Sequence, residues 1–147
     1  MEVLLKSAEA LFKESKNNTS LLANASAFIM HTIENLNWVG FYIYEDNALI
    51  VGPFQGKPAC VEIEVGKGVC GNAFKDNSVF NVPNVHLFED HIACDGASNS
   101  ELVIPLVKNG NKIGVFDIDS PIYNRFDKDL QNFLEMFAKI LLNYYHE

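Results

Sequence analysis

The sequence is poor in basic residues and has no long apolar run, and both shortages exclude broad classes of function. Its 147 residues include 11 Lys and Arg against 19 Asp and Glu, which gives a formal net charge of −8. Nucleic acids and anionic membranes attract basic surfaces, so we expect neither as a partner. A membrane-spanning helix needs about 20 consecutive apolar residues, and no run here approaches that length. The N-terminus also lacks the features of a secretory signal, so we expect a cytoplasmic protein.

Cysteine is scarce as well, because Cys60, Cys70 and Cys94 are the three in the chain. An odd number in a reducing compartment argues against a static disulfide framework and leaves buried inert thiols, a metal site or a redox function. The spacings of 10 and 24 residues, without a C-x-x-C pair, match no usual structural zinc site, and we predict no metal. The sequence also lacks the H-E-x-x-H, P-loop, G-x-G-x-x-G and G-x-S-x-G motifs.

What is present is typical of a folded globular chain, with 48% hydrophobic and 20% charged residues. A length of 147 residues suits one domain, which we expect to span residues 1–147. Apolar residues recur at helical spacing in three segments. The first spans residues 2–15, the second runs from an N-cap at Thr19 or Ser20 to Leu36, and the third follows an N-cap at Asp127. These patterns predict two N-terminal helices and one C-terminal helix.

Between these helices the apolar period changes to two, which is typical of strands. The pair Asn109-Gly110 between two apolar runs is a strong hairpin signal, and Pro105 indicates a sheet edge or a bulge because it cannot donate to a ladder. Strands are predicted over 38–44, 48–54, 60–65, 78–82, 102–107 and 113–119, with a short helix over 69–74. The order predicts an α+β fold, in which N-terminal and C-terminal helices flank one antiparallel sheet.

Residues 83–100 are a long irregular segment that contains Cys94. Segments of this length are uncommon unless they are functional or disordered, and the Ser, Asn, Gly and Asp residues around Cys94 favour turns. Chemistry is more often placed on loops than in a core. The interpretation of a thiol as a small buried hydrophobe therefore suits Cys60 and Cys70 but is weaker for Cys94.

Two pairs of strand residues are candidates for a binding pocket. Asp117 and Asp119 share one face of a strand that is apolar at its other end, so they mark either a strand end in solvent or a pocket wall. If buried, the two carboxyls would raise each other's pKa unless a cation such as a ligand ammonium lay between them. Trp38 and Tyr42 also share a face, either in the core or as an aromatic wall, and Gly40 between them leaves room for an approaching group.

Six short motifs together resemble the free methionine-(R)-sulfoxide reductases, which are single-domain enzymes of the GAF fold. All three cysteines of that family are present at its spacing, and the combination is more specific than the GAF fold, which mostly hosts ligand-sensing modules. The motifs are Trp38-Val39-Gly40-Phe41-Tyr42, Gly66-x-Gly68-Val69-Cys70-Gly71, Val82-Pro83-Asn84-Val85-His86, His91-Ile92-Ala93-Cys94-Asp95, Ser98-x-Ser100-Glu101 and Asp117-Ile118-Asp119-Ser120-Pro121.

The resemblance implies that Cys94 is the nucleophile. Its thiolate would attack the sulfoxide sulfur and be left as a sulfenic acid, which a second thiol would convert to a disulfide. Cys60 and Cys70 match the resolving cysteines, with Cys60 the better candidate for the main partner. Glu101 matches an acidic group of the pocket and is our candidate for protonating the sulfoxide oxygen. No bound cofactor is implied, because an external dithiol, thioredoxin, would reduce the disulfide.

The rest of the substrate pocket follows from the same resemblance. Asp117 and Asp119 match acidic groups that bind the substrate, and Trp38 and Tyr42 match its aromatic wall. Asn84 stands where Asp is common in the family, outside these roles. The family tends toward homodimers. The rival expectation is a non-catalytic GAF module that senses a small ligand or the redox state, and a metal-binding sensor is a third.

Overall fold

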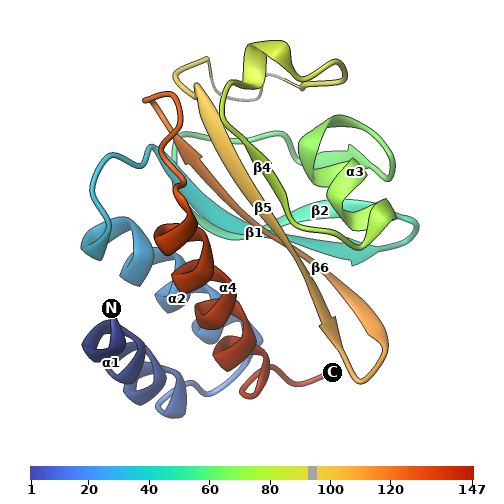
Figure 1. Ribbon diagram of the computed structural model, residues 1–147. Coiled ribbons are helices and arrows are strands. Elements are labelled where there is room, and N and C mark those ends of the chain that lie inside the picture. Colours follow the sequence, from blue (N-terminus) through green and yellow to red (C-terminus); the bar gives the residue numbers. More distant parts are fainter. Residues whose placement is uncertain (93–95) are drawn as a thin grey trace.

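The computed structural model describes residues 1–92 and 96–147, with a six-stranded sheet at its centre (Figure 1). All neighbouring strands are antiparallel, in the order β3-β2-β1-β6-β5-β4. The strands are β1 (Trp38–Glu45), β2 (Ala48–Gly56), β3 (Glu62–Glu64), β4 (Phe80–Val82), β5 (Ser100–Lys108) and β6 (Asn111–Ser120). The helices are α1 (Glu2–Lys13), α2 (Asn18–Thr32), α3 (Gly68–Asp76), the 3-10 helix η1 (Val85–Leu87) and α4 (Lys128–Leu142). The predicted fold class is confirmed.

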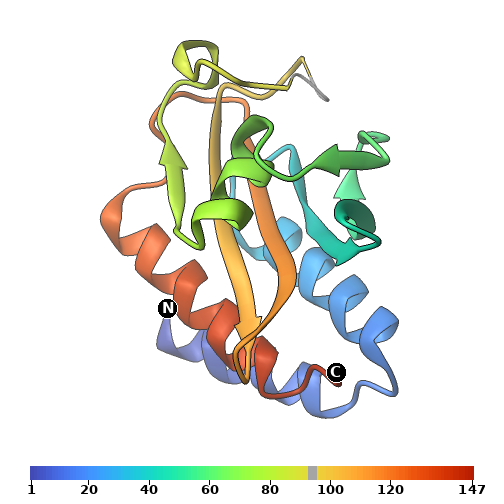
Figure 2. The ribbon, with the colours of Figure 1, turned by 90° about the vertical axis from the view of Figure 1, so that its right-hand side faces the viewer.

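The two faces of the sheet are covered unequally. Helices α1, α2 and α4 pack on one face, and the shorter α3 lies on the other (Figure 1). In the view of Figure 2, α3 lies in front of the sheet and the longer helices lie behind it. None of the helices in the described ranges is long and apolar enough to cross a membrane. The face under α3 is therefore the less protected one, and it carries the residues of interest.

Side chains alternate between these faces, as strand geometry requires. Val39 and Phe41 of β1 join the core under the long helices, whereas Trp38 and Tyr42 belong to the second cluster, under α3. Phe41 stacks on Phe116 of β6 with a centroid distance of 4.8 Å. Burying side chains of this kind contributes about 1.5–3 kcal/mol each. The helical face thus supplies a stable platform for the polar groups on the opposite face.

The hairpin between β5 and β6 forms where the sequence predicts it. Asn109 and Gly110 have φ angles of +52° and +80°, as a two-residue type I′ turn requires. Strand β4 pairs with β5 only over residues 101–103, so in the described chain Pro105 has no neighbour on that side. The missing N–H of Pro105 is tolerated for this reason, and the predicted local edge is confirmed.

A bulge in the same hairpin decides which side chains of β5 and β6 lie together. The register shifts by one residue between positions 106 and 107, after which Glu101 pairs with Asp119. Without the shift Glu101 would pair with Ile118, which faces the core under the helices. Because directly opposed residues of antiparallel strands share a face, the bulge brings the two carboxyls to the same side of the sheet.

Several boundaries predicted from the sequence are wrong: the second helix ends at Thr32 rather than Leu36, and β4 begins at Phe80 rather than at residue 78. The N-cap of α2 is Asn17 rather than Thr19 or Ser20, since Ser20 N–H donates to Asn17 Oδ1 at 2.8 Å and Asn17 N–H donates to Ser20 Oγ at 3.2 Å. This reciprocal pair satisfies two backbone donors that the helix start would otherwise leave open. Strand β3 spans only Glu62–Glu64, the part that pairs with β2, so Cys60 lies in the loop before it.

Candidate active site

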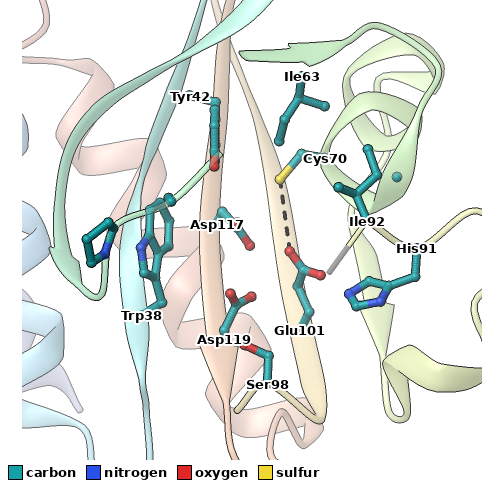
Figure 3. Close-up of a pocket in the computed structure, with 13 residues that line it drawn as sticks. Trp38, Tyr42, Ile63, Cys70, His91, Ile92, Ser98, Glu101, Asp117 and Asp119 are labelled. Atoms are coloured by element: carbon teal, nitrogen blue, oxygen red, sulfur yellow. Dashed lines mark hydrogen bonds between the residues drawn. The ribbon is translucent and has the colours of Figure 1, made fainter. Parts of the chain in front are cut away.

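Three carboxyl groups meet on the less covered face because of the strand register. Asp119 on β6 lies opposite Trp38 on β1 and opposite Glu101 on β5. Asp117, two residues earlier on β6, points to the same face and lies opposite Gly40 and Val103. Directly opposed residues have Cβ atoms about 4.5–5.5 Å apart. Figure 3 shows the three carboxyl groups directed into one space.

This acidic cluster is withdrawn from water. Glu101 is 7% exposed and Asp117 is 5% exposed, while Asp119 is half-buried. The Oδ1 atoms of Asp117 and of Asp119 are buried and accept no hydrogen bond from the described residues. Burial is the main cause that raises the pKa of each group. The charge of Asp117 adds to the effect at Glu101, that of Asp119 at Asp117, and that of Glu101 at Asp119. Burial and mutual repulsion therefore favour the protonated forms of these carboxyls.

An aromatic wall stands beside the carboxyls. The Trp38 ring stacks on Tyr42 with centroids 5.8 Å apart, and on Phe54 with centroids 5.1 Å apart. A Cβ atom at Gly40 would lie 2.3 Å from that of Phe54 and 2.7 Å from the Trp38 ring. The expectation that Gly40 leaves room for a ligand is therefore wrong, because neighbouring rings fill that space. The glycine is instead required for the rings to stack.

The carboxyls and the rings enclose a small cavity, whose far wall comes from α3 and from the segment before β5. Its volume is about 40 Å³, enough for a few water molecules and far below the roughly 300–1,000 Å³ of ordinary ligand sites. A ligand must therefore widen it. The lining residues are Trp38, Tyr42, Pro58, Ala59, Ile63, Gly68, Cys70, His91, Ile92, Ser98, Glu101, Asp117 and Asp119.

Cys70, in the first turn of α3, is a free thiol and only 3% exposed. Its Sγ lies 3.9 Å from Oε2 of Glu101 (Figure 3). Burial, and next the charge of Asp117, raise the pKa of the thiol well above its ordinary value. A protonated thiol is a poor nucleophile. Cys70, Glu101 and Asp117 bring ligand atoms within 4.8 Å of one another, close enough to hold one small ion.

The other two cysteines differ in what the structure describes. Cys60 is half-buried and disulfide-bonded, in the loop that follows Gly56. Its neighbours Pro58 and Ala59 line the cavity. Cys94, the predicted nucleophile, lies outside the described residues.

Two lining residues with polar side chains, His91 and Ser98, were not assigned a role from the sequence. His91 is half-buried, and its pKa is lowered by burial and next by the charge of His86, which favours a neutral imidazole. Ser98 is 5% exposed and its Oγ accepts a hydrogen bond from Asn37 Nδ2 at 3.0 Å. Both lie in the irregular segment, where no period indicates which side chains point inward.

Comparison with known proteins agrees with this geometry. A GAF domain model matches residues 18–142. The free methionine-R-sulfoxide reductase of Escherichia coli (strain K12) is 48% identical over 132 residues, which are 89% of this chain and 80% of that protein. The fRMsr of Staphylococcus aureus in complex with substrate has a TM-score of 0.93 and 44% identity, covering 99% of this chain and 95% of that one. The chain belongs to the free methionine-R-sulfoxide reductase family, within the GAF fold.

A protein described as a putative GAF sensor, from Burkholderia vietnamiensis, is equally close in structure, with a TM-score of 0.94 and 43% identity over 98% of this chain and 92% of that one.

In the present chain, six of the eight residues predicted for the site line the cavity. They are Trp38, Tyr42, Cys70, Glu101, Asp117 and Asp119. Asp117 and Asp119 therefore form a pocket wall rather than a strand end in solvent.

Proposed function

We propose that this protein reduces the R epimer of free methionine sulfoxide to methionine by thiol chemistry. The observation that carries the proposal is the buried acidic cluster facing an aromatic wall, in a chain of this family. A free amino acid differs from a methionine residue in a protein by its ammonium and carboxylate groups. A site with three carboxyl groups and an aromatic wall suits a small ligand that is cationic at one end and apolar at the other.

Binding uses the buried carboxyl oxygens that have no hydrogen-bond partner among the described residues. The substrate ammonium donates to the buried Oδ1 atoms of Asp117 and Asp119, which accept no hydrogen bond from the described residues. The apolar part of the substrate packs on Trp38 and Tyr42, which are both 2% exposed. Because the cavity is small, entry of the substrate requires the segment that carries His91 and Ile92 to move outward.

In the first chemical step the thiolate of Cys94 attacks the sulfoxide sulfur. The sulfur gains two electrons and becomes the thioether of methionine, while the oxygen, protonated by Glu101, ends on Cys94 as a sulfenic acid. Glu101 suits the role of acid because burial, and next the charge of Asp117, raise its pKa and so favour its protonated form. The substrate ammonium offsets the charge of the acidic cluster and so favours the Cys94 thiolate.

In the second step Cys60 condenses with the sulfenic acid, which yields a disulfide and water. Two observations favour Cys60 over Cys70 as the main resolving cysteine. Cys60 is found disulfide-bonded, and Cys70 is a free, buried thiol whose pKa is raised. An external dithiol, for which thioredoxin in a reducing cytoplasm is our candidate, then reduces the disulfide.

The test couples the reduced protein to thioredoxin, thioredoxin reductase and NADPH and follows each epimer of free methionine sulfoxide separately. We expect NADPH oxidation with the R epimer only, its loss in Cys94→Ser, and its retention in Cys70→Ser. Substrate should also be consumed as the free amino acid and not as an N-acetylated, C-amidated analogue. Binding without turnover of either epimer by the reduced protein would refute the enzyme and favour a GAF module that senses a ligand.

A further inference from the structure

The loop of residues 57–61 carries Cys60, and the two aromatic side chains of the pocket wall hold its backbone. The indole N–H of Trp38 donates to the carbonyl of Lys57 at 3.2 Å. The hydroxyl of Tyr42 donates to the carbonyl of Cys60 itself at 3.1 Å. The loop is therefore attached at its first residue and at its cysteine, and both attachments come from side chains that also line the cavity.

The two donors are fixed more firmly than the loop they hold. Trp38 and Tyr42 are each 2% exposed, and their strand pairs with β2 on one side and with β6 on the other. The Trp38 ring is stacked between Tyr42 and Phe54. Residues 57–61 lie between β2 and β3 in no regular element. The carbonyl of Val61, at the end of the loop, also accepts a hydrogen bond from Val51 N–H at 2.9 Å. Because the rings are immobilised by the sheet and by stacking, they fix the part of the loop from Lys57 to Cys60.

We propose that Tyr42 is a positioning residue for disulfide formation, whose hydroxyl fixes the backbone of Cys60 where its thiol reaches the oxidised nucleophile. This inference rests on the proposed function. In that step the Cys60 Sγ–H loses its proton, an S–S bond forms to the sulfenic sulfur at Cys94, and the S–O bond breaks, so that hydroxide and the proton leave as water. A disulfide requires Cα atoms within about 7 Å. The backbone position of Cys60 thus controls the rate.

The proposal separates two tasks of one side chain. The ring face of Tyr42 contacts the substrate in the first step, and its hydroxyl acts in the second. Tyr42→Phe keeps the ring and removes the donor. Because the ring also lines the substrate site, the quantity measured is the ratio of the rate of disulfide formation to the rate of methionine formation in a single turnover. We expect this ratio to fall about tenfold in Tyr42→Phe, which corresponds to about 1.4 kcal/mol in the barrier of the second step.

The experiment uses Cys70→Ser as the background, so that any intramolecular disulfide reports Cys60. Fully reduced protein is mixed with excess free methionine (R)-sulfoxide without reductant and quenched over time. Methionine, free thiols and sulfenic acid trapped by dimedone are measured in each sample. Tyr44→Phe is the matched control, because Tyr44 is on the same strand but exposed, and its hydroxyl donates to Asn47 Oδ1 at 3.3 Å, away from the loop.

The outcomes separate this inference from the proposed function. Slower disulfide formation with more trapped sulfenic acid in Tyr42→Phe, and unchanged rates in Tyr44→Phe, support the positioning role. An unchanged ratio of the two rates overturns it, whether both steps are normal or both are slowed by a general structural defect. If Tyr42→Phe does not fold, Trp38→Phe tests the same ratio through the Lys57 contact. Absence of methionine in the unsubstituted protein refutes the proposed function instead.

Discussion

Replacing Asp117 by Asn should make the empty protein more stable and at the same time a poorer enzyme. Asp117 is 5% exposed, its Oδ1 has no hydrogen-bond donor among the described residues, and burial with the nearby charge of Asp119 raises its pKa. Asn has nearly the same shape, carries no charge, and can donate to the neighbouring carboxyls. An unsatisfied buried polar group costs about 1–3 kcal/mol, so we expect the free energy of unfolding to rise by about 1–2 kcal/mol at pH 7.

The effect should depend on pH with a definite sign. A folded-state pKa above the unfolded value means that the folded protein binds more protons, so wild-type stability falls as the pH rises from about the ordinary value of 3.8 toward the raised value. Asn does not titrate. The difference between Asp117→Asn and the wild type should therefore be small near pH 4 and should grow toward pH 8.

Urea unfolding at pH 4, 6 and 8 measures this difference, and the expected gain at pH 7 corresponds to roughly 3–6 °C in Tm for a chain of this size. Asp76→Asn is the matched control, because Asp76 is exposed and its replacement removes the same formal charge. We expect the free energy of unfolding of this variant to stay within about 0.5 kcal/mol of wild type.

A charged hydrogen bond to the substrate ammonium is worth about 1.5–3 kcal/mol, so kcat/KM should fall about 10–150-fold in Asp117→Asn. A variant less stable than wild type at pH 7 would refute the reasoning about the empty cluster.

Three further predictions follow from the same geometry. Binding of free methionine should release protons, because the ammonium lowers the raised pKa values of the carboxyls; calorimetry in two buffers of different ionisation enthalpy measures this, and equal heats would contradict the contact. The pKa of Cys94 should fall when a substrate analogue binds, and thiolate titration that shows no downward shift would exclude activation by the ligand charge. Cys60→Ser should still form one equivalent of methionine, but its thioredoxin-dependent steady-state rate should fall about tenfold or more. The steady-state rate of Cys70→Ser should stay within about threefold of wild type. The opposite result would show that Cys70 is the main resolving cysteine.

Features that depend on one strand could be predicted from the sequence. The period of two placed Asp117 and Asp119 on one face and Trp38 and Tyr42 on another strand's face, and the structure puts all four around one cavity. The local turn chemistry of Asn109 was equally informative. The sequence pattern could not predict whether the acidic face lies in solvent or in a pocket. That depends on which segments pack over this face of the sheet.

Features that depend on several elements could not be predicted in this way. Glu101 reaches Asp119 only because the hairpin register shifts by one residue, and no period in the sequence reports that shift. The contact between Cys70 and Glu101 depends on how α3 docks against β5 and β6. Gly40 was misread for a related reason, since its partner Phe54 lies on the neighbouring strand and fills the expected gap.

The position of Trp38 gives the protein a built-in optical reporter. It is the single tryptophan of the chain, it is 2% exposed, it lines the cavity, and its indole N–H donates to the carbonyl of Lys57 in the loop that carries Cys60. Its fluorescence therefore originates from one known place and requires no label. Ligand entry alters the environment of the ring face, and movement of the loop alters the environment of the indole N–H. Stopped-flow emission can consequently time substrate binding and loop movement in the unmodified protein.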